Sequence, residues 1–207
     1  MKIAVVAANG RSGQAFVQAA LAAGHTVHAG IHGKDTLRES SNLIKFDCDA
    51  TNRADVARLI QGTDAVVSMI GHVKGSPHTV QTDAMRNIIS VMEAAHISRI
   101  VSLTGTGVRF AGDKIPLIDR VANVAIRLID PNRIKDGIMH VDVLKNSTAE
   151  WTLLRVLKLQ GDASTHFRLS LHGPTKLFVS RSDVARAVLE VLEAGSFKRE
   201  APILSRP

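Results

Sequence analysis

Residues 3–24 read IAVVAANGRSGQAFVQAALAAG, and this stretch decides the fold class. The apolar run at its start predicts a buried strand. The apolar residues that recur at helical spacing after Gly13 predict a helix that ends near Gly24. A strand, a glycine-containing turn and a helix in this order are typical of the first unit of a nucleotide-binding α/β fold.

The alternation of strand and helix patterns continues to residue 104. Strands are predicted at residues 2–7, 25–31, 43–47, 64–70 and 98–104, and helices over residues 12–23, from Thr51-Asn52 to Gly62, and from Ser76-Pro77 onward. Strands separated by helices need crossover connections, so the sheet is predicted to be parallel with helices on both faces. We therefore predict one Rossmann-type, doubly wound α/β domain over residues 1–207.

The pattern becomes less regular after residue 104. We predict a loop at 105–113, helices at 116–130 and 132–147, strands at 151–156, 164–171 and 202–205, and a helix at 184–192 behind a capping box of Ser180 and Asp183. Residues 105–140 leave the carboxyl edge of the sheet, where ligands of open α/β folds bind. This segment is predicted to form a lid on the substrate side, with Phe110 in its apolar face and Arg109 as a cationic group.

Composition limits the classes of partner. The net charge is +7, but the lysines and arginines are scattered, so we expect a solvated basic surface with a phosphate site and no nucleic-acid partner. No apolar run is long enough to span a membrane. Cys48 is the single cysteine, which suits a reducing compartment, and the chain starts directly with a strand, so we expect a cytoplasmic protein. The sequence leaves the oligomeric state open.

The glycines of the first turn have separate roles. Gly10 lets the backbone approach a pyrophosphate, and Gly13 lets the helix pack on the strand. Ala7 stands where a third glycine is common, and a negative φ is expected for it because a positive φ penalises a Cβ. The helix N-terminus at Ser12 offers free N–H groups to phosphate. The alternative is an ordinary turn between strand and helix.

The end of the second strand bears on the choice of cofactor. Residues 31–34 read IHGK, and no acid precedes Asp35. An acid there would bind a ribose 2′-hydroxyl, whereas His32 and Lys34 would accept a 2′-phosphate, which Arg11 is also expected to reach. We predict NADP(H) in preference to NAD(H). The alternative is that His32 and Lys34 belong to a plain surface loop.

With these residues in view, the sequence resembles the atypical short-chain dehydrogenase/reductase superfamily. The similar branch is the NAD(P)H-binding one, which holds flavin and biliverdin reductases, quinone reductases and redox-sensing regulators. The resemblance rests on five segments: VVAANGRSGQAFVQAALAAGHTV (5–27), IKFDCDATNRADVARLIQGTDAVVSMIG (44–71), RIVSLTGTGVRF (99–110), STAEWTLLRVLKL (147–159) and FVSRSDVARAVLEVLE (178–193).

The resemblance implies a set of cofactor contacts along the chain. They are Asn9, Gly10, Arg11, Ser12 and Gly13 in the glycine loop; His32, where relatives usually carry arginine; Asp47 and Cys48 at the adenine; Met69, Ile70 and Gly71 along the ribose; Thr104 beside the nicotinamide; and Val156 and Leu157 after the sixth strand.

The chain departs from the superfamily in its catalytic residues. Many members use a Tyr-x-x-x-Lys pair as proton donor, and the absence of tyrosine from this chain excludes that mechanism. His140, with an imidazole pKa near neutrality, and Thr104 are the candidate catalytic residues. Asp142 falls where relatives often carry an acid. The alternative is that His140 and Asp142 both lie on a helix surface.

Other chemistries lack support. His25, His28 and His32 have no cysteine or carboxylate at metal-ligand spacing, so no metal site is predicted. The carboxylates beside Cys48 raise a thiol pKa, so a reactive cysteine is not expected.

We predict an NAD(P)H-dependent reductase that transfers hydride to a small conjugated acceptor, which is a flavin, a quinone or a tetrapyrrole. A ring acceptor needs chiefly orientation by the protein, and this suits a chain without a tyrosine acid. The alternative is an NADP(H)-binding redox-sensing regulator without turnover.

Overall fold

The apolar runs of the sequence fold into the strands of a central sheet. In the computed structural model, which describes residues 1–73, 75–160, 166–175 and 178–206, these strands are β1 (Lys2–Val6), β2 (Thr26–Ile31), β3 (Leu43–Asp47), β4 (Ala65–Ser68), β5 (Arg99–Gly105), β6 (Glu150–Val156), β8 (Arg168–Ser170) and β10 (Ile203–Ser205). Two further strands, β7 (Lys158–Gln160) and β9 (Phe178–Ser180), pair with each other.

The strand order is β3-β2-β1-β4-β5-β6-β10-β8. Neighbouring strands run parallel from β3 to β10, and β10 pairs with β8 in the antiparallel direction. Strands β2 and β3 are added on one side of β1, and β4, β5 and β6 on the other side, so the strand order switches between β1 and β4. Such a switch places a crevice outside the carboxyl ends of these two strands. This order confirms the predicted Rossmann-type, doubly wound fold.

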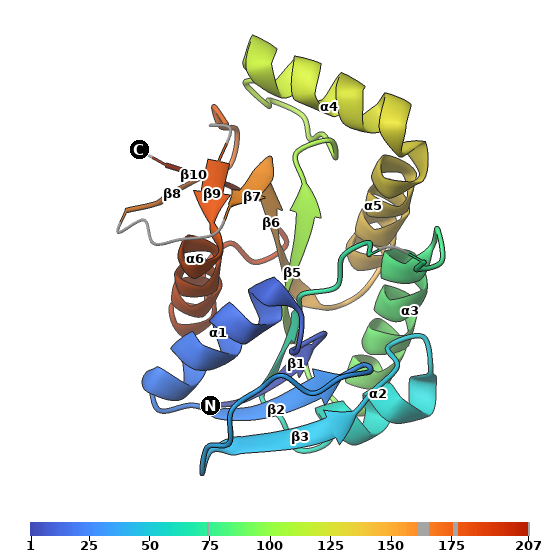
Figure 1. Ribbon diagram of the computed structural model, residues 1–207, viewed down its shortest axis with the longest axis vertical. Coiled ribbons are helices and arrows are strands. Elements are labelled where there is room, and N and C mark those ends of the chain that lie inside the picture. The colour runs from blue at the N-terminus through green and yellow to red at the C-terminus, as the bar shows by residue number, and fades with distance from the viewer. Residues whose placement is uncertain (74, 161–165, 176–177, 207) are drawn as a thin grey trace.

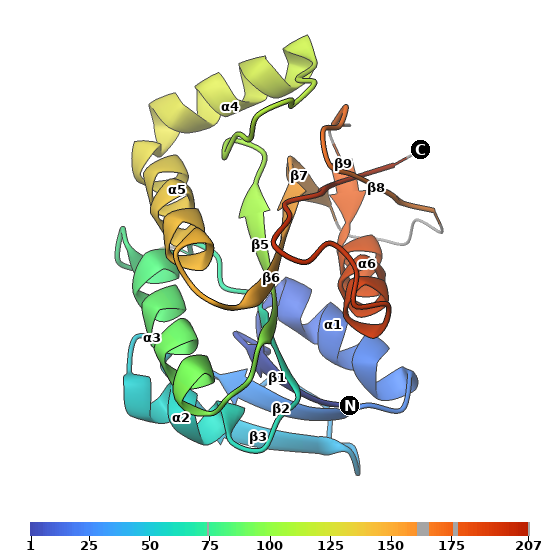
Figure 2. The ribbon, with the colours of Figure 1, turned by 180° about the vertical axis from the view of Figure 1, so that it is seen from behind.

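Helices cover both faces of the sheet. They are α1 (Arg11–Ala22), α2 (Arg53–Ile60), α3 (Val80–Ala94), α4 (Leu117–Ile129), α5 (Pro131–Lys145) and α6 (Arg181–Glu193). In Figure 1, α1 and α6 lie on one side of the sheet and α2, α3 and α5 on the other; Figure 2 shows the same layers from behind.

Each central strand contributes to two apolar cores. Ile3 and Val5 of β1 pack in one core with Phe16 of α1, whereas Ala4 and Val6 pack in the second core, on the side of α2 and α3. Because both faces of such a strand are buried, its sequence is apolar throughout and does not alternate.

Three local predictions need correction. Helix α3 begins at Val80 and not at Ser76-Pro77, because the N–H and hydroxyl of Ser76 both donate to the carbonyl of Val73 and hold Ser76 outside the helix. The pair β7–β9 was not predicted, because three-residue strands carry too little periodicity. The strand expected at 164–171 is described only as β8, and residues 164 and 165 lie outside the described part of the chain.

Helix α4 is amphipathic as predicted, but much of its apolar surface faces solvent. Leu117 and Leu128 are 76% and 80% exposed, and Val121 and Val124 between them are also exposed. The helix packs on α5 and reaches beyond the sheet at the top of Figure 1. None of the described helices is long and apolar enough to cross a membrane.

Candidate functional site

A cavity of about 720 Å³ lies at the carboxyl edge of the sheet. Its walls come from the N-termini of α1 and α6, from the ends of β4, β5 and β6, and from α4 and α5. Eight of the predicted site residues line it: Arg11, Ser12, Met69, Ile70, Gly71, Thr104, Val156 and Leu157. The topology therefore brings together residues from four distant parts of the sequence at the position where an open α/β sheet binds its ligand.

The glycine loop departs from expectation at Ala7. Its φ is +59°, so the expected negative φ is wrong. The chain turns sharply here, because the N–H of Ala8 donates to the carbonyl of Gly30 (2.8 Å) and the N–H of Gly10 donates to the carbonyl of Ala7 (3.2 Å). These two bonds hold a side chain in the left-handed region, where a Cβ costs about 1–2 kcal/mol.

Gly13 lets α1 pack closely on the preceding strand, as predicted. A Cβ on Gly13 would lie 2.3 Å from the carbonyl oxygen of Ala7, so only glycine lets α1 approach the strand this closely. Gly10 is the N-cap of α1 and provides no side-chain cap for its first N–H groups. Free N–H groups at a helix N-terminus beside a cavity are suited to a pyrophosphate, so the loop fits the nucleotide that the sequence predicts.

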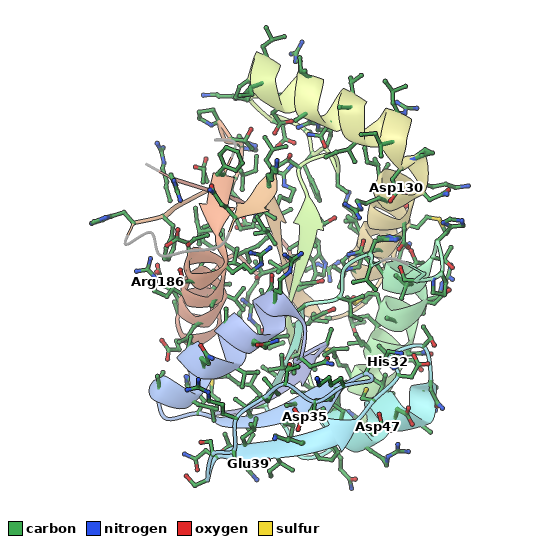
Figure 3. All side chains as sticks on the ribbon, viewed as in Figure 1. His32, Asp35, Glu39, Asp47, Asp130 and Arg186 are labelled. Atoms are coloured by element: carbon green, nitrogen blue, oxygen red, sulfur yellow. The ribbon has the colours of Figure 1, made fainter. Side chains whose placement is uncertain are left out.

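A second group of predicted residues lies away from this cavity, at the ends of β2 and β3. The side-chain amide of Asn9 donates to the carbonyls of His32 and Lys34 (both 2.9 Å) and so joins the glycine loop to the loop after β2. His32 and Asp47 lie on this side of the molecule in Figure 3. The nearest acid after β2, Asp35, is paired with Lys45 (2.9 Å). The side chains of His32 and Lys34 are therefore better placed than the carboxylate of Asp35 to bind a phosphate on the ribose.

Cys48 is buried behind the same loop, and its N–H donates to the carbonyl of Ile31 (2.8 Å). Burial, with a smaller contribution from the charges of Asp55 and Asp49, raises the pKa of the thiol to about 12. The raised pKa agrees with the prediction, but its main cause is burial and not the adjacent carboxylates. The thiol is therefore not a nucleophile at neutral pH.

Arg181 was not singled out from the sequence, although it follows the predicted cap Ser180 directly. The hydroxyl of Ser180 accepts the N–H of Asp183 (3.0 Å), and this fixes Arg181 as the first residue of α6. Arg181 and Arg11 line the same cavity. Burial and the nearby charge of Arg11 lower the pKa of Arg181. Two guanidinium groups without a carboxylate partner among the described residues form a site suited to an anion.

Thr104 lies at the inner end of the cavity. It is buried at the end of β5 next to Gly137 of α5, where a Cβ would lie 3.1 Å from the Thr104 hydroxyl. Gly137 thus allows α5 to pack against the position that the resemblance assigns to the nicotinamide.

His140 does not line the cavity. It is buried on α5, and its Nε2 lies 3.1 Å from the hydroxyl of Ser102. Burial lowers its pKa to about 4, so the expected near-neutral pKa is wrong and the ring is uncharged at neutral pH. The alternative of a helix surface is also wrong for His140, whereas Asp142 is exposed.

The segment at 105–140 contributes to the cavity through its helices. Ala122, Asn123 and Ile126 of α4 and Ile134 of α5 line it. Arg109 does not line it; its guanidinium is 2.5 Å from the buried carboxylate of Asp119. The expected cationic group of the lid is therefore wrong, because that charge is neutralised within the protein.

Phe110 does not line the cavity. Its ring packs against the second apolar core and lies 4.4 Å from Nζ of Lys145 and 4.7 Å from the guanidinium carbon of Arg155. No cluster of metal-ligating side chains occurs among the described residues.

His72 and Asp136 are the main members of the site that the sequence did not reveal. His72 lines the cavity, and its Nε2 is 2.9 Å from Oδ2 of Asp136, which is fully buried on α5. The N–H groups of Gln81 and Thr82 donate to the same carboxylate (2.9 and 3.0 Å), as does the Thr82 hydroxyl. Because 64 residues separate His72 from Asp136, no local motif indicates the pair.

Comparison with known proteins agrees with this geometry. A family model for NAD(P)H-binding proteins matches residues 7–194. The uncharacterised protein YwnB of Bacillus subtilis (strain 168) is 24% identical over 218 residues, which cover 97% of this chain and 96% of YwnB.

Solved structures with the same fold include two bacterial proteins. A short-chain dehydrogenase/reductase from Veillonella parvula DSM 2008 in complex with NADP has a TM-score of 0.79 at 19% identity, covering 100% of this chain and 94% of that one. SP1627 of Streptococcus pneumoniae TIGR4, provisionally assigned as an NADH-flavin reductase, has a TM-score of 0.76 at 22% identity and covers 100% of both chains. At these identities the likeness shows a shared fold.

Proposed function

Because the chain belongs to the NAD(P)H-binding family, we propose that it is an NADP(H)-dependent reductase that transfers hydride to a small conjugated acceptor such as a flavin, a quinone or a tetrapyrrole. The observation that carries the proposal is the cavity of about 720 Å³, which continues from Arg11 past Thr104 to α4 and α5. A redox sensor without turnover needs no space over the nicotinamide. An open cavity at this position supports an enzyme.

The anionic groups of the cofactor are assigned to two basic sites. Arg11 and Arg181, with the N-terminus of α1, hold the pyrophosphate, because both guanidinium groups line the cavity that Thr104 also lines. His32 and Lys34 hold the 2′-phosphate, because Asn9 ties their backbone to the glycine loop. This replaces the expectation that Arg11 reaches the 2′-phosphate. The NADP complex of the Veillonella parvula neighbour is consistent with a site for that phosphate.

The chemistry requires orientation more than a reactive side chain. When bound, the reduced nicotinamide supplies the hydride. Thr104 and Leu157 line the inner cavity and orient the reacting rings, and Ile126 and Ile134 exclude water from the acceptor. A small-molecule acceptor is the expected partner, with no nucleic acid or membrane, and we propose a cytoplasmic location.

The test is cofactor affinity, measured by fluorescence titration of NADPH and NADH. The double variant His32→Ala/Lys34→Ala should bind NADPH about ten- to a hundredfold more weakly and NADH nearly as before, because it loses charge-assisted contacts to the 2′-phosphate. Arg11→Ala should weaken both cofactors equally, because the pyrophosphate is common to them.

The control is Arg58→Ala, which removes an exposed arginine on α2. Equal losses for both cofactors in the double variant would contradict the preference for NADP(H). Wild-type protein that binds NADPH yet reduces no flavin, quinone or tetrapyrrole would contradict the reductase and favour the sensor.

A further inference from the structure

His72 and Asp136 form an oriented pair at the wall of the cavity. The His72 side chain is only 8% exposed and Asp136 is completely buried. Nε2 of His72 lies 2.9 Å from Oδ2 of Asp136, and the other ring nitrogen, Nδ1, has no hydrogen-bond partner among the described residues. The ring therefore has one nitrogen, Nε2, within ion-pair distance of a carboxylate but not in hydrogen-bond geometry, and one left for a ligand of the cavity that it lines.

Asp136 is itself held rigidly. It accepts the N–H groups of Gln81 and Thr82 and the hydroxyl of Thr82, and so caps the N-terminus of α3 from α5. A carboxylate fixed by three donors places a fixed negative charge beside the imidazole, 2.9 Å from Nε2. A buried histidine with a purely structural role usually has hydrogen-bond partners for its ring nitrogens. Here Nδ1 has none among the described residues, and the ring lines a cavity large enough for a ligand.

His72 lines the same cavity as Thr104, the residue beside which the proposed function places the nicotinamide. His72 follows Met69, Ile70 and Gly71, which line the cavity at the end of β4, and Thr104 lines it at the end of β5, the next strand of the sheet. His140, the donor expected from the sequence, lies behind β5 and does not line the cavity.

We propose that His72, oriented by Asp136, donates a proton to the acceptor, and that the acceptor is a conjugated carbonyl compound, a quinone or an enone, whose oxygen receives that proton. This inference rests on the proposed reductase function and narrows its acceptor. The acceptor gains two electrons and one hydrogen as hydride from the reduced cofactor. Its oxygen gains the Nδ1 proton of the doubly protonated His72 ring, which becomes neutral and keeps the proton on Nε2, and Nδ1 then regains a proton from solvent.

The type of acceptor that is affected distinguishes proton donation by His72 from a structural role of His72. Reduction of a quinone creates a negative oxygen that a general acid stabilises, and such an acid typically contributes a hundredfold or more. A flavin takes the hydride and is released as an anion without a proton from the protein. In His72→Gln, we expect turnover of 1,4-naphthoquinone to fall about a hundredfold and that of FMN to stay within threefold, with unchanged NADPH affinity.

His78→Gln is the matched control, because His78 is an exposed histidine of the same loop and does not line the cavity. Asp136→Asn tests the positioning role and should lower naphthoquinone turnover about tenfold, with FMN again unaffected. His72→Asn is the second variant if His72→Gln does not fold. Equal losses with both acceptors, or no loss with naphthoquinone, would overturn the assignment.

A binding measurement tests His72 without turnover. The phenol oxygen of 4-nitrophenol resembles the oxygen of a carbonyl acceptor that has received the hydride but not yet the proton. The absorption of 4-nitrophenol reports whether phenol or phenolate is bound. We expect the NADP⁺-bound wild type to bind it about tenfold more tightly than His72→Gln. Equal affinity would overturn the assignment even if the wild type reduces quinones, and a tighter wild type would support it even if no acceptor is turned over.

Discussion

The two halves of the molecule are held together in different ways. In residues 1–105, parallel strands β1 to β5 are paired by backbone hydrogen bonds and separate two apolar cores. In residues 106–206, β6, β8 and β10 continue the sheet and α6 packs on the first apolar core, and buried charged side chains join the described segments in addition. Asp113 binds Arg155, and Asp119 binds Arg109, Asn123 and Thr175.

This difference agrees with the roles that we propose for the two halves. Most of the proposed cofactor contacts lie in the first half, at a regular sheet edge. The second half contributes loops and two helices, α4 and α5, to the side of the cavity proposed for the acceptor. Such irregular segments have many backbone groups without ladder partners, and buried ionic side chains fix them in place.

The largest expected effect lies in the second half. Arg155 is completely buried, donates to both oxygens of Asp113 (2.5 and 2.8 Å), and donates to the carbonyls of Ala201 and Leu171. Arg155→Met leaves the Asp113 carboxylate buried and unpaired, so the free energy of unfolding should fall by about 3–5 kcal/mol in urea titration. Arg155→Met/Asp113→Leu should recover part of the loss.

The matched pair in the first half is Arg86 with Asp83, which is exposed on α3. Arg86→Ala should change the free energy of unfolding by less than about 1 kcal/mol. If the two arginine variants had similar effects, the proposed difference between the halves would be wrong.

The next effect concerns the contact between the halves, where His140 of α5 packs against Ser102 of β5. Burial lowers the pKa of His140 to about 4 from 6.5, so the unfolded chain takes up the proton first as pH falls. The stability that the neutral ring contributes is complete above pH 6.5 and is lost between 6.5 and 4. The loss amounts to roughly 3 kcal/mol.

In His140→Gln, the free energy of unfolding should not show this loss between pH 6.5 and 4. Urea titrations at several pH values would measure it. His96→Gln, in an exposed turn, is the control and should keep the slope of the wild type. A slope unchanged in His140→Gln would show that the ring is not buried in its neutral form.

The smallest effect lies in the first half, at Ala7. Because its φ is +59°, Ala7→Gly should relieve left-handed strain and raise the free energy of unfolding by about 0.5–1 kcal/mol after the entropy of glycine is subtracted. Ala8→Gly, at a buried neighbour with ordinary φ, should lower it. Thermal denaturation distinguishes the two, and a destabilised Ala7→Gly would contradict the assigned strain.

The same difference explains what could be predicted from the sequence. The apolar runs and the loop at Gly10 and Gly13 predicted the first five strands and the crevice, because buried parallel strands and helix N-termini have local signatures. Arg155, Arg181 and the pair His72–Asp136 had none, since their roles depend on partners in other elements. Ala7 shows a second limit: two backbone hydrogen bonds override the preference of a single side chain.

The place of β10 in the sheet has a consequence for the order in which the strands can pair during synthesis. β10 is formed by residues near the end of the sequence, yet it lies inside the sheet between β6 and β8. A chain leaves the ribosome N-terminal end first, so β1 to β5 can pair while later residues are still being added. β8 has no neighbour in the sheet until Ile203–Ser205 emerges. A nascent chain therefore carries an unpaired edge at β6 until residues 203–205 have been added, and β10 then covers this edge against pairing with other chains.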